Sequence, residues 1–312
     1  MSNSNLIVVG VDGTATTAPT VQYAAQMAQR WDSDLRVVHV VPQAARTGGL
    51  YAIVPDYFEA AGARILREAV KVAEETIAPE RVHPLLKHGT RVATVLRESE
   101  DARAVVLGFD SRSSLERLAT GSTVAGVASR SLAEVVVVPL LPTPHTGQHT
   151  GQHTGQHTVA VGIKDAAGSA DLLREAFAVA AERGADLRII HAAWLPRGYE
   201  DLLDTQQQNA IVAGLTDEIR ASAGPIAQQH RDVAFDVQVV HGQAARVLAK
   251  ASASAELLVV ERRRHPLLMG HLGGTARALL RASECPVVIM PPAAAAEGSP
   301  QAAAAEEGQR VP

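Results

Sequence analysis

The chain has 312 residues, of which 46% are hydrophobic and 20% are charged, a balance typical of packed globular proteins. Its net charge of −4 argues against a nucleic-acid-binding protein, because such proteins present a basic face to the phosphate backbone. A single cysteine, Cys285, rules out an intrachain disulfide and fits a cytoplasmic location, and no apolar stretch approaches membrane-spanning length.

The first half of the chain alternates apolar runs of strand length with segments of helical periodicity. The runs predict strands at Leu6–Val11, Leu35–Val41, Val82–Leu86, Ala104–Leu107 and Val135–Leu141. The segments between them predict helices at Ala18–Trp31, Asp56–Ile77, Arg91–Glu100 and Ala119–Leu132. This alternation indicates a doubly wound α/β fold, a parallel sheet covered by helices on both faces.

Ligands in such folds bind beyond the carboxyl ends of the strands. Asp12-Gly13-Thr14 follows the first predicted strand, and His39-Val40 lies at the end of the second. Asp12 has two interpretations, the N-cap of a helix and a ligand contact. We interpret His39 as a strand residue, since no Ser-His-Asp set can be assembled around it.

Between Ala104 and Thr123 the chain runs from an apolar strand through a loop of small residues into a helix. Gly108 ends the strand, and Gly121-Ser122-Thr123 opens the helix. Free N–H groups at a helix start attract anions, and the two hydroxyl groups add donors, so this order suits a phosphate. The alternative is a loop that binds nothing, because the stretch is neither a Walker loop nor a dinucleotide fingerprint.

The middle and the end of the chain differ from the rest in composition. Residues 142–158 contain the unit His-Thr-Gly-Gln three times from His145, and we interpret them as a flexible linker; the alternative is a transition-metal site on the spaced histidines. Residues 293–312 are rich in Ala, Glu and Gln and are predicted to be disordered.

The second half repeats the first at an offset of 152 or 153 residues. Its apolar runs predict strands at Val159–Ile163, Leu187–Ala193, Val237–Val240, Leu257–Val260 and Val287–Met290. His39 corresponds to His191, and Gly121-Ser122 corresponds to Gly274-Thr275. A period this long indicates a duplicated domain, so we predict one domain at 1–141 and a second at 159–292.

With these residues the chain resembles the universal stress protein (UspA-like) family in its tandem two-domain form. The family's nucleotide loop follows the pattern Gly-x2-Gly-x9-Gly-Ser/Thr, which Gly108, Gly121 and Ser122 match at the correct spacing. Ser111 stands where the family has its second glycine, and this departure weakens the inference of binding. The resemblance implies two adenine nucleotide alpha hydrolase-like domains of five strands each.

The resemblance also implies ATP, with or without Mg²⁺, on domain 1. Asp12 and Val40 would contact adenosine. The full set of expected contact residues is Asp12, Gly13, Thr14, Val40, Gly108, Ser111, Gly121, Ser122 and Thr123.

Domain 2 differs at the equivalent positions. Lys164 replaces Asp12, Glu261 replaces Gly108 and Arg264 replaces Ser111. We therefore predict that domain 2 is mainly structural and does not bind ATP in the family manner. The basic run 262–265, together with Lys164, is either an anion site or a solvated loop.

In the family the last strand of one domain pairs with that of a partner. This implies that Val135–Leu141 and Val287–Met290 pair with each other or across a homodimer, which would cover an apolar edge strand.

The implied role is a cytoplasmic, ATP-binding regulator of the stress response that has no catalytic residues. Two alternatives remain. One is an interaction protein of the same fold in which Ser111 has abolished ATP binding. The other is an ATP hydrolase or nucleotidyl transferase, for which Asp110 is the nearby carboxylate.

Overall fold

The computed structural model describes residues 5–42, 55–110, 121–140, 157–193, 204–262 and 272–292. The strands of domain 1 are β1 (Leu6–Val11), β2 (Asp34–Pro42), β3 (Val82–Gly89), β4 (Ala104–Phe109) and β5 (Glu134–Pro139). Those of domain 2 are β6 (Thr158–Ile163), β7 (Asp186–Ala193), β8 (Phe235–His241), β9 (Leu257–Glu261) and β10 (Val287–Met290). They form one sheet in the order β3-β2-β1-β4-β5-β10-β9-β6-β7-β8.

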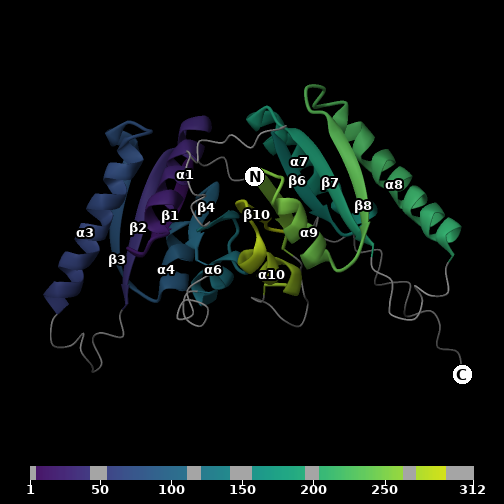
Figure 1. Cartoon of the computed structure of the whole chain (residues 1–312). Helices are drawn as coiled ribbons and strands as arrows, with labels where there is room; N and C mark the ends of the chain where they lie inside the picture. Colours follow the sequence, from purple (N-terminus) through teal and green to yellow (C-terminus); the bar gives the residue numbers. More distant parts are fainter. Residues whose placement is uncertain are drawn as a thin grey trace, which may run out of the picture.

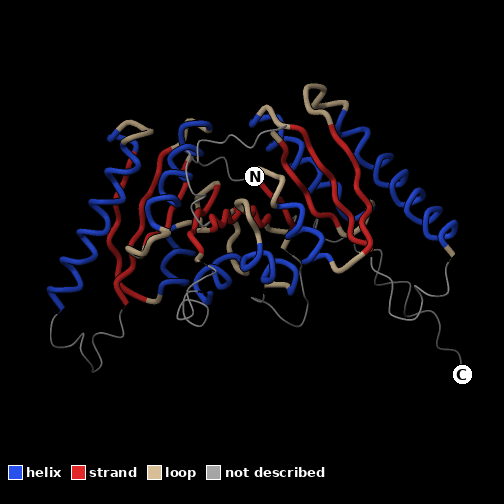
Figure 2. Tube along the Cα trace, in the orientation of Figure 1, coloured by secondary structure: helices blue, strands red, loops and turns tan. Residues whose placement is uncertain are grey.

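Helices cover both faces of this sheet, which confirms the predicted doubly wound α/β fold (Figures 1 and 2). Domain 1 contributes α1 (Thr17–Arg30), α3 (Pro55–Glu74), α4 (Arg91–Glu98) and α6 (Gly121–Ala128). Domain 2 contributes α7 (Ala170–Arg183), α8 (Thr205–Ala227), α9 (Ala244–Ser252) and α10 (Gly274–Ala282). Short 3-10 turns lie at Pro79–Arg81 and Ala167–Ser169.

The alternation of side chains along the strands divides the interior into two apolar layers. On β1, Ile7 and Val9 face α1 and α3, while Val8 faces α4 and α6. Each layer continues without a break from domain 1 into domain 2. The two halves of the chain therefore share their hydrophobic cores.

The junction between the halves is the pairing of β5 with β10. It is antiparallel, with Val136 opposite Val288 at its centre, whereas all other strand pairs among the described residues are parallel. Val136 and Val288 occupy equivalent positions in the two domains, so the junction lies on an approximate twofold axis.

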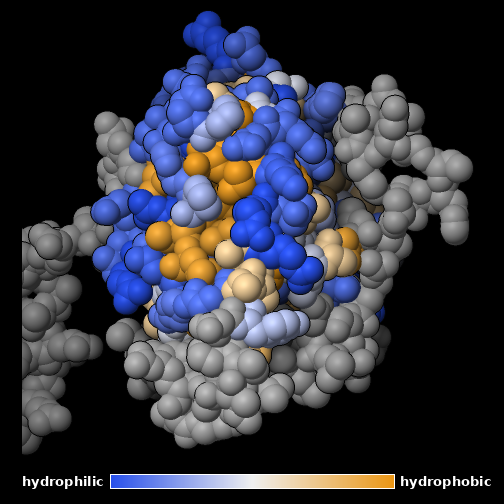
Figure 3. Space-filling view, turned by 90° about the vertical axis from the view of Figure 1, so that its left-hand side faces the viewer, coloured by the Kyte–Doolittle hydropathy of each residue, from blue (hydrophilic) through white to orange (hydrophobic). Residues whose placement is uncertain are grey.

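The outer edges of the sheet are β3 and β8. Figure 3 looks at the β3 end of the molecule, where apolar surface is visible among polar side chains. Along β3, His83, Pro84 and His88 are exposed. A proline and polar side chains on an edge strand hinder its pairing with another chain.

Several predicted boundaries are wrong. The strand predicted at Val82–Leu86 extends to Gly89, the one predicted to end at Leu107 extends to Phe109, and the helix predicted at Asp56–Ile77 ends at Glu74.

Two further differences have a visible cause. The fifth strand was expected to reach Leu141, but β5 ends at Pro139, because its neighbour β4 ends at Phe109, the residue opposite. Leu141 itself lies outside the described residues. The helix expected to reach Leu132 ends at Ala128, and Leu132 is 80% exposed.

The reason for this early helix end comes from domain 2. Arg262 Nη1 donates to the carbonyl oxygens of Ala128 (3.1 Å) and Ser131 (2.8 Å). Ser131 Oγ also donates to Ala133 O at 2.9 Å. These bonds satisfy carbonyl groups that the helix leaves unpaired, so the chain turns there.

On the opposite face of the sheet, polar contacts join α1 to α7. Glu182 accepts from Trp31 Nε1 (2.6 Å) and from Arg103 Nη2 (3.1 Å), and the Arg103 guanidinium lies 3.6 Å from the centre of the Trp31 ring. Arg183 donates to Tyr23 OH at 2.9 Å. Burial raises the pKa of Tyr23.

Glu134, at the start of β5, interacts electrostatically with the charged side chains of this cluster. Burial raises the pKa of its carboxyl group to about 7; Arg103 opposes this shift, whereas Glu175 and Glu182 add to it. The carboxyl group is therefore protonated in the folded protein at a pH where it is charged in the unfolded chain.

We expect this group to make the protein less stable as the pH rises. Because the folded pKa is above the unfolded one, the contribution of Glu134 is complete below pH about 4.5 and is lost as the pH rises through about 7. Linkage sets the loss at about 3 kcal/mol. Urea unfolding of wild type and Glu134→Gln between pH 4.5 and 8 tests this. The difference in unfolding free energy between them should shift with pH in favour of the variant, and a constant difference would contradict the assignment.

Candidate functional site

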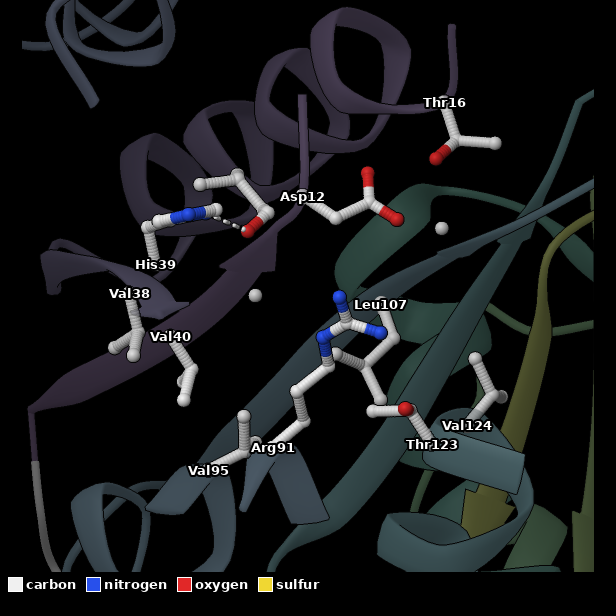
Figure 4. Close-up of a pocket in the computed structure, with 13 residues that line it drawn as sticks. Asp12, Thr16, Val38, His39, Val40, Arg91, Val95, Leu107, Thr123 and Val124 are labelled. Carbon is white, nitrogen blue, oxygen red and sulfur yellow. Dashed lines mark hydrogen bonds between the residues drawn. The ribbon is translucent and has the colours of Figure 1, made fainter. Parts of the chain in front are cut away.

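A cleft opens in domain 1 where the strand order changes direction. β1 lies between β2 and β4. From β1 the chain adds β2 and β3 on one side, and it then crosses back to add β4 and β5 on the other side. The carboxyl ends of these strands diverge there, as at the ligand crevices of other doubly wound sheets. The cleft is lined by Gly10, Val11, Asp12, Thr16, Val38, His39, Val40, Arg91, Val95, Leu107, Gly108, Thr123 and Val124 (Figure 4).

Asp12 organises the turn between β1 and α1. Its Oδ1 accepts from Thr14 N (3.0 Å), Thr14 Oγ1 (2.7 Å) and Thr17 Oγ1 (3.4 Å). The N-cap of α1 is Thr16, so the interpretation of Asp12 as an N-cap is wrong. All three bonds use Oδ1, and no bond to a described residue occupies Oδ2.

Gly13 and Thr14 belong to the same turn but do not line the cleft. Gly13 has a φ of +79°, and a Cβ there would lie 2.7 Å from Ile65 Cδ1. The backbone at this point therefore requires glycine. Gly13 and Thr14 shape the position of Asp12, whether or not they touch a ligand.

The end of β2 supplies the apolar side of the cleft. Val38 and Val40 are buried, and His39 Nδ1 donates to Val11 O at 2.8 Å, which ties β2 to the end of β1. A carbonyl oxygen can only accept, so this bond places the proton of a neutral ring on Nδ1. His39 thus holds two strand ends together.

Gly108 lies where β4 approaches α1 closely. A Cβ at this residue would lie 2.4 Å from Thr20 Oγ1 and 2.7 Å from Thr16 Oγ1. Packing alone therefore requires glycine here. A phosphate that approaches the backbone would require glycine too, so this residue does not distinguish the two reasons.

The remaining predicted residues are placed unequally. Thr123 lines the cleft, and Gly121 and Ser122 are the first two residues of α6, whose start faces the same region. Ser111 lies outside the described residues. The structure thus brings Asp12, Val40, Gly108 and Thr123 to one cleft.

Two lining residues from α4, Arg91 and Val95, were not predicted. Arg91 is the first residue of α4 and follows Gly89, which has a φ of +146°. Its counterpart Gly242 has a φ of +143°, so the chain turns in the same way in both domains. The repeated His-Gly pair marks this turn in the sequence, and it could have pointed to the residue two positions later.

Domain 2 has a cleft at the equivalent place with different walls. Ala244 stands where domain 1 has Arg91, and Glu261 stands where it has Gly108. The domain 2 cavity has a volume of about 780 Å³, against about 70 Å³ in domain 1. Gly168 and Leu172 stand in domain 2 where domain 1 has Thr16 and Thr20. The two hydroxyl groups that would clash with a side chain at position 108 are therefore missing beside Glu261, the equivalent position.

Charges in the domain 2 cleft are already paired in part. Lys164 Nζ lies 3.4 Å from Asp165 Oδ2, and Asp165 Oδ1 accepts from Gly168 N at 2.7 Å. The Gly168 bond and Lys164 lower the pKa of Asp165. Arg262 donates to domain 1, which conflicts with its assignment to a cationic anion site; residues 263–265 lie outside the described part of the chain.

The described residues also answer three further questions about function, which concern a metal site, a reactive cysteine and a membrane-spanning helix. They hold no group of three or more His, Cys, Asp or Glu side chains that could bind a metal ion. Cys285 is buried, and burial raises the pKa of its thiol to about 12. None of the helices that the structure describes is long and apolar enough to cross a membrane.

Comparison with known proteins gives one consistent result. The model of the universal stress protein family matches residues 4–139 and again residues 156–291. A universal stress protein of Mycobacterium tuberculosis is 30% identical over 294 residues, covering 91% of this chain and 96% of the relative. Another from the same organism is 27% identical over 315 residues, covering 91% and 94%.

Solved structures agree on the fold. The crystal structure of a universal stress protein from Archaeoglobus fulgidus matches with a TM-score of 0.65 at 17% identity, covering 93% of this chain and 97% of that one. Because its identity is low, this likeness concerns the arrangement of elements and not the ligand.

We expect Gly108→Ala to destabilise the protein by about 1–3 kcal/mol, because the new Cβ collides with Thr16 and Thr20 on α1. Gly214→Ala is the matched control: this glycine lies within α8 with no atom within 4 Å of a Cβ. Alanine there should stabilise by about 0.5–1 kcal/mol. Urea unfolding measures both, and an unchanged Gly108→Ala variant would show that α1 and β4 do not approach so closely.

Proposed function

Because the chain belongs to the universal stress protein family, with two family domains in tandem, we propose that its domain 1 binds ATP and acts as a nucleotide-dependent regulator in the stress response. In this proposal domain 2 is mainly structural. The nucleotide is bound and not turned over.

The convergence of four predicted residues on one cleft carries this proposal. Asp12, Val40, Gly108 and Thr123 come from four different elements and line the same cavity. Val40 offers an apolar wall to adenine, and Asp12 Oδ2 faces no competing bond from a described residue, so it can accept from a ribose hydroxyl.

The phosphate side rests on the start of α6. Gly121 is its first residue and Ser122 its second, and the first N–H groups of a helix have no intrahelical partners. A phosphate placed there gains both these donors and the helix dipole. Gly108 gives close access to the β4 backbone from the other side.

Binding without turnover fits the side chains of the cleft better than hydrolysis does. Asp12 is the one carboxylate among its described lining residues, and three bonds already hold its Oδ1. Asp110, the alternative metal ligand, follows β4 and does not line the cleft.

Calorimetric titration of the full chain with ATP and magnesium chloride tests this function. We expect one ATP per chain in wild type. Gly121→Glu should abolish binding, since a carboxylate would face the phosphate at the start of α6. Gly274→Glu, the same change at the equivalent position of domain 2, should leave binding intact.

Three other results would be informative. Two ATP molecules per chain, one lost in each variant, would contradict the assignment to domain 1 alone. Release of inorganic phosphate from bound ATP would favour the enzyme. No binding by wild type would favour the interaction protein, and Ser111→Gly would then show whether the serine is responsible.

We also propose that the β5–β10 surface pairs domain 1 with domain 2 and not with a second copy of itself. Around the twofold axis, Arg103 and Glu182 face each other across the junction at 3.1 Å. The equivalent positions in the opposite domains are Glu256 and Arg30. Burial and Arg183 lower the pKa of Arg30, whereas Glu256 and Glu182 raise it, so both acids act on this arginine.

On one side of the axis an arginine of domain 1 pairs with a glutamate of domain 2. On the other side, Arg30 of domain 1 lies in the field of Glu256 of domain 2, whose ion pair is with Arg183 of its own domain. In a pair of two domains 1, Arg103 would face Arg30. In a pair of two domains 2, Glu256 would face Glu182. Like charges so placed disfavour both homotypic pairs, and opposite charges favour the mixed one.

A charge swap at this contact provides the test. Arg103→Glu should lower the unfolding free energy by on the order of 1 kcal/mol, because both side chains are partly exposed and solvent screens them. Adding Glu182→Arg should recover at least half of that loss. Urea unfolding of the two single variants and the double variant measures the coupling energy between the two side chains. If the changes in unfolding free energy were strictly additive, the proposed attraction between Arg103 and Glu182 would be contradicted.

A further inference from the structure

Arg91 is the feature of the domain 1 cleft that the proposed function does not explain. Its guanidinium lies in the middle of the cleft, with Asp12 on one side and Thr123 on the other (Figure 4). The start of α4 places it there, because the turn at Gly89 directs the first residue of the helix over the ends of β1 and β4.

The charge of Arg91 is not neutralised by the protein around it. Its guanidinium makes no hydrogen bond or ion pair with the residues that the structure describes. Asp12, the nearest acid of the cleft, bonds to threonines and lies beyond ion-pair distance. The cleft therefore holds a cation whose five donors are available to a ligand.

Arg91 is one of several differences between the clefts of the two domains. The cavity measures about 70 Å³ in domain 1, where Arg91 is part of the lining, and about 780 Å³ in domain 2, where Ala244 stands at the equivalent position and other walls also differ. Sites for small molecules typically measure about 300–1,000 Å³. A volume of about 70 Å³ is too small for a nucleoside, so side chains of the domain 1 cleft must move when one binds. The Arg91 side chain can move at little cost, because its guanidinium makes no hydrogen bond or ion pair with a described residue.

We propose that Arg91 is the specificity-determining residue of the domain 1 cleft and selects nucleosides that carry a phosphate on the ribose. This inference rests on the proposed nucleotide binding. Arg91 lines the cleft between the adenosine wall at Val40 and the start of α6, so after a small movement its guanidinium can lie beside a phosphate bound at α6. Its planar fork can donate two parallel bonds to that phosphate, whereas adenosine offers no anion.

This role also bears on Ser111. A side chain at the second glycine position of the loop hinders close approach of the backbone to a phosphate. Arg91 gives this chain a phosphate contact that does not depend on loop glycines.

The test compares AMP with adenosine. Both are titrated calorimetrically into the full chain as wild type, Arg91→Ala and Arg91→Lys. Arg97→Ala is the matched control, because Arg97 lies on the same helix, carries the same charge and does not line the cleft.

In Arg91→Ala we expect AMP to bind about 10- to 100-fold more weakly, the effect of losing a charged hydrogen-bonded pair. Adenosine should bind as well as in wild type or better, since the cleft becomes larger. Arg91→Lys should be intermediate, because an ammonium keeps the charge without the fork, and Arg97→Ala should match wild type.

The outcomes separate this inference from the function it rests on. If wild type binds AMP and adenosine and both affinities change by the same factor in Arg91→Ala, in either direction, Arg91 is an obstruction or a scaffold and the inference is overturned. If wild type binds ATP as proposed but the preference for AMP over adenosine persists in Arg91→Ala, the inference alone fails. If wild type binds none of the three ligands, both proposals fail.

Discussion

The antiparallel pairing of β5 with β10 is the contact on which the rest of the structure depends. Separated, each domain would expose an apolar edge strand with a row of unpaired N–H and C=O groups. Joined, the two strands complete one sheet, and both apolar layers run through it from one end to the other. The same contact places the end of α6 against Arg262 and places α1 against α7.

The two halves keep one backbone and differ in the side chains at the cleft. Gly89 and Gly242 share a positive φ, Gly10 makes room for Leu107 of the neighbouring strand β4, and Gly162 makes room for Leu248 of α9. These positions serve folding. The changes fall where strands end at the cleft, so the two clefts differ in charge and in space while the fold stays the same.

How much of this could be predicted from the sequence depends on the range of the interaction. Runs of Val, Ile and Leu identified the strands, since burial on both faces selects such residues regardless of their partners. The strand-end rule brought Asp12 and Gly108 to one cleft, because all parallel strands end at the same edge.

What the sequence did not reveal is set by contacts between distant residues. The end of α6 depends on Arg262, more than 130 positions away, and the Arg103–Glu182 contact joins residues 79 apart. Arg91 begins a predicted helix, but its reach into the cleft depends on how α4 packs against the sheet. Local patterns carry no information about any of these.

The close approach of β4 to α1 also limits the paths by which the two halves could have diverged. A side chain at position 108 collides with the hydroxyl groups of Thr16 and Thr20, whereas Glu261 faces Gly168 and Leu172 in their places. In a half like domain 1, a side chain at the strand end clashes unless the helix has already lost those hydroxyl groups, so the order of the two changes matters. Reverting Glu261 to glycine by itself would restore neither the threonines nor their packing. A glycine-lined strand end of this kind therefore depends on its helix, and neither can be restored by a single substitution.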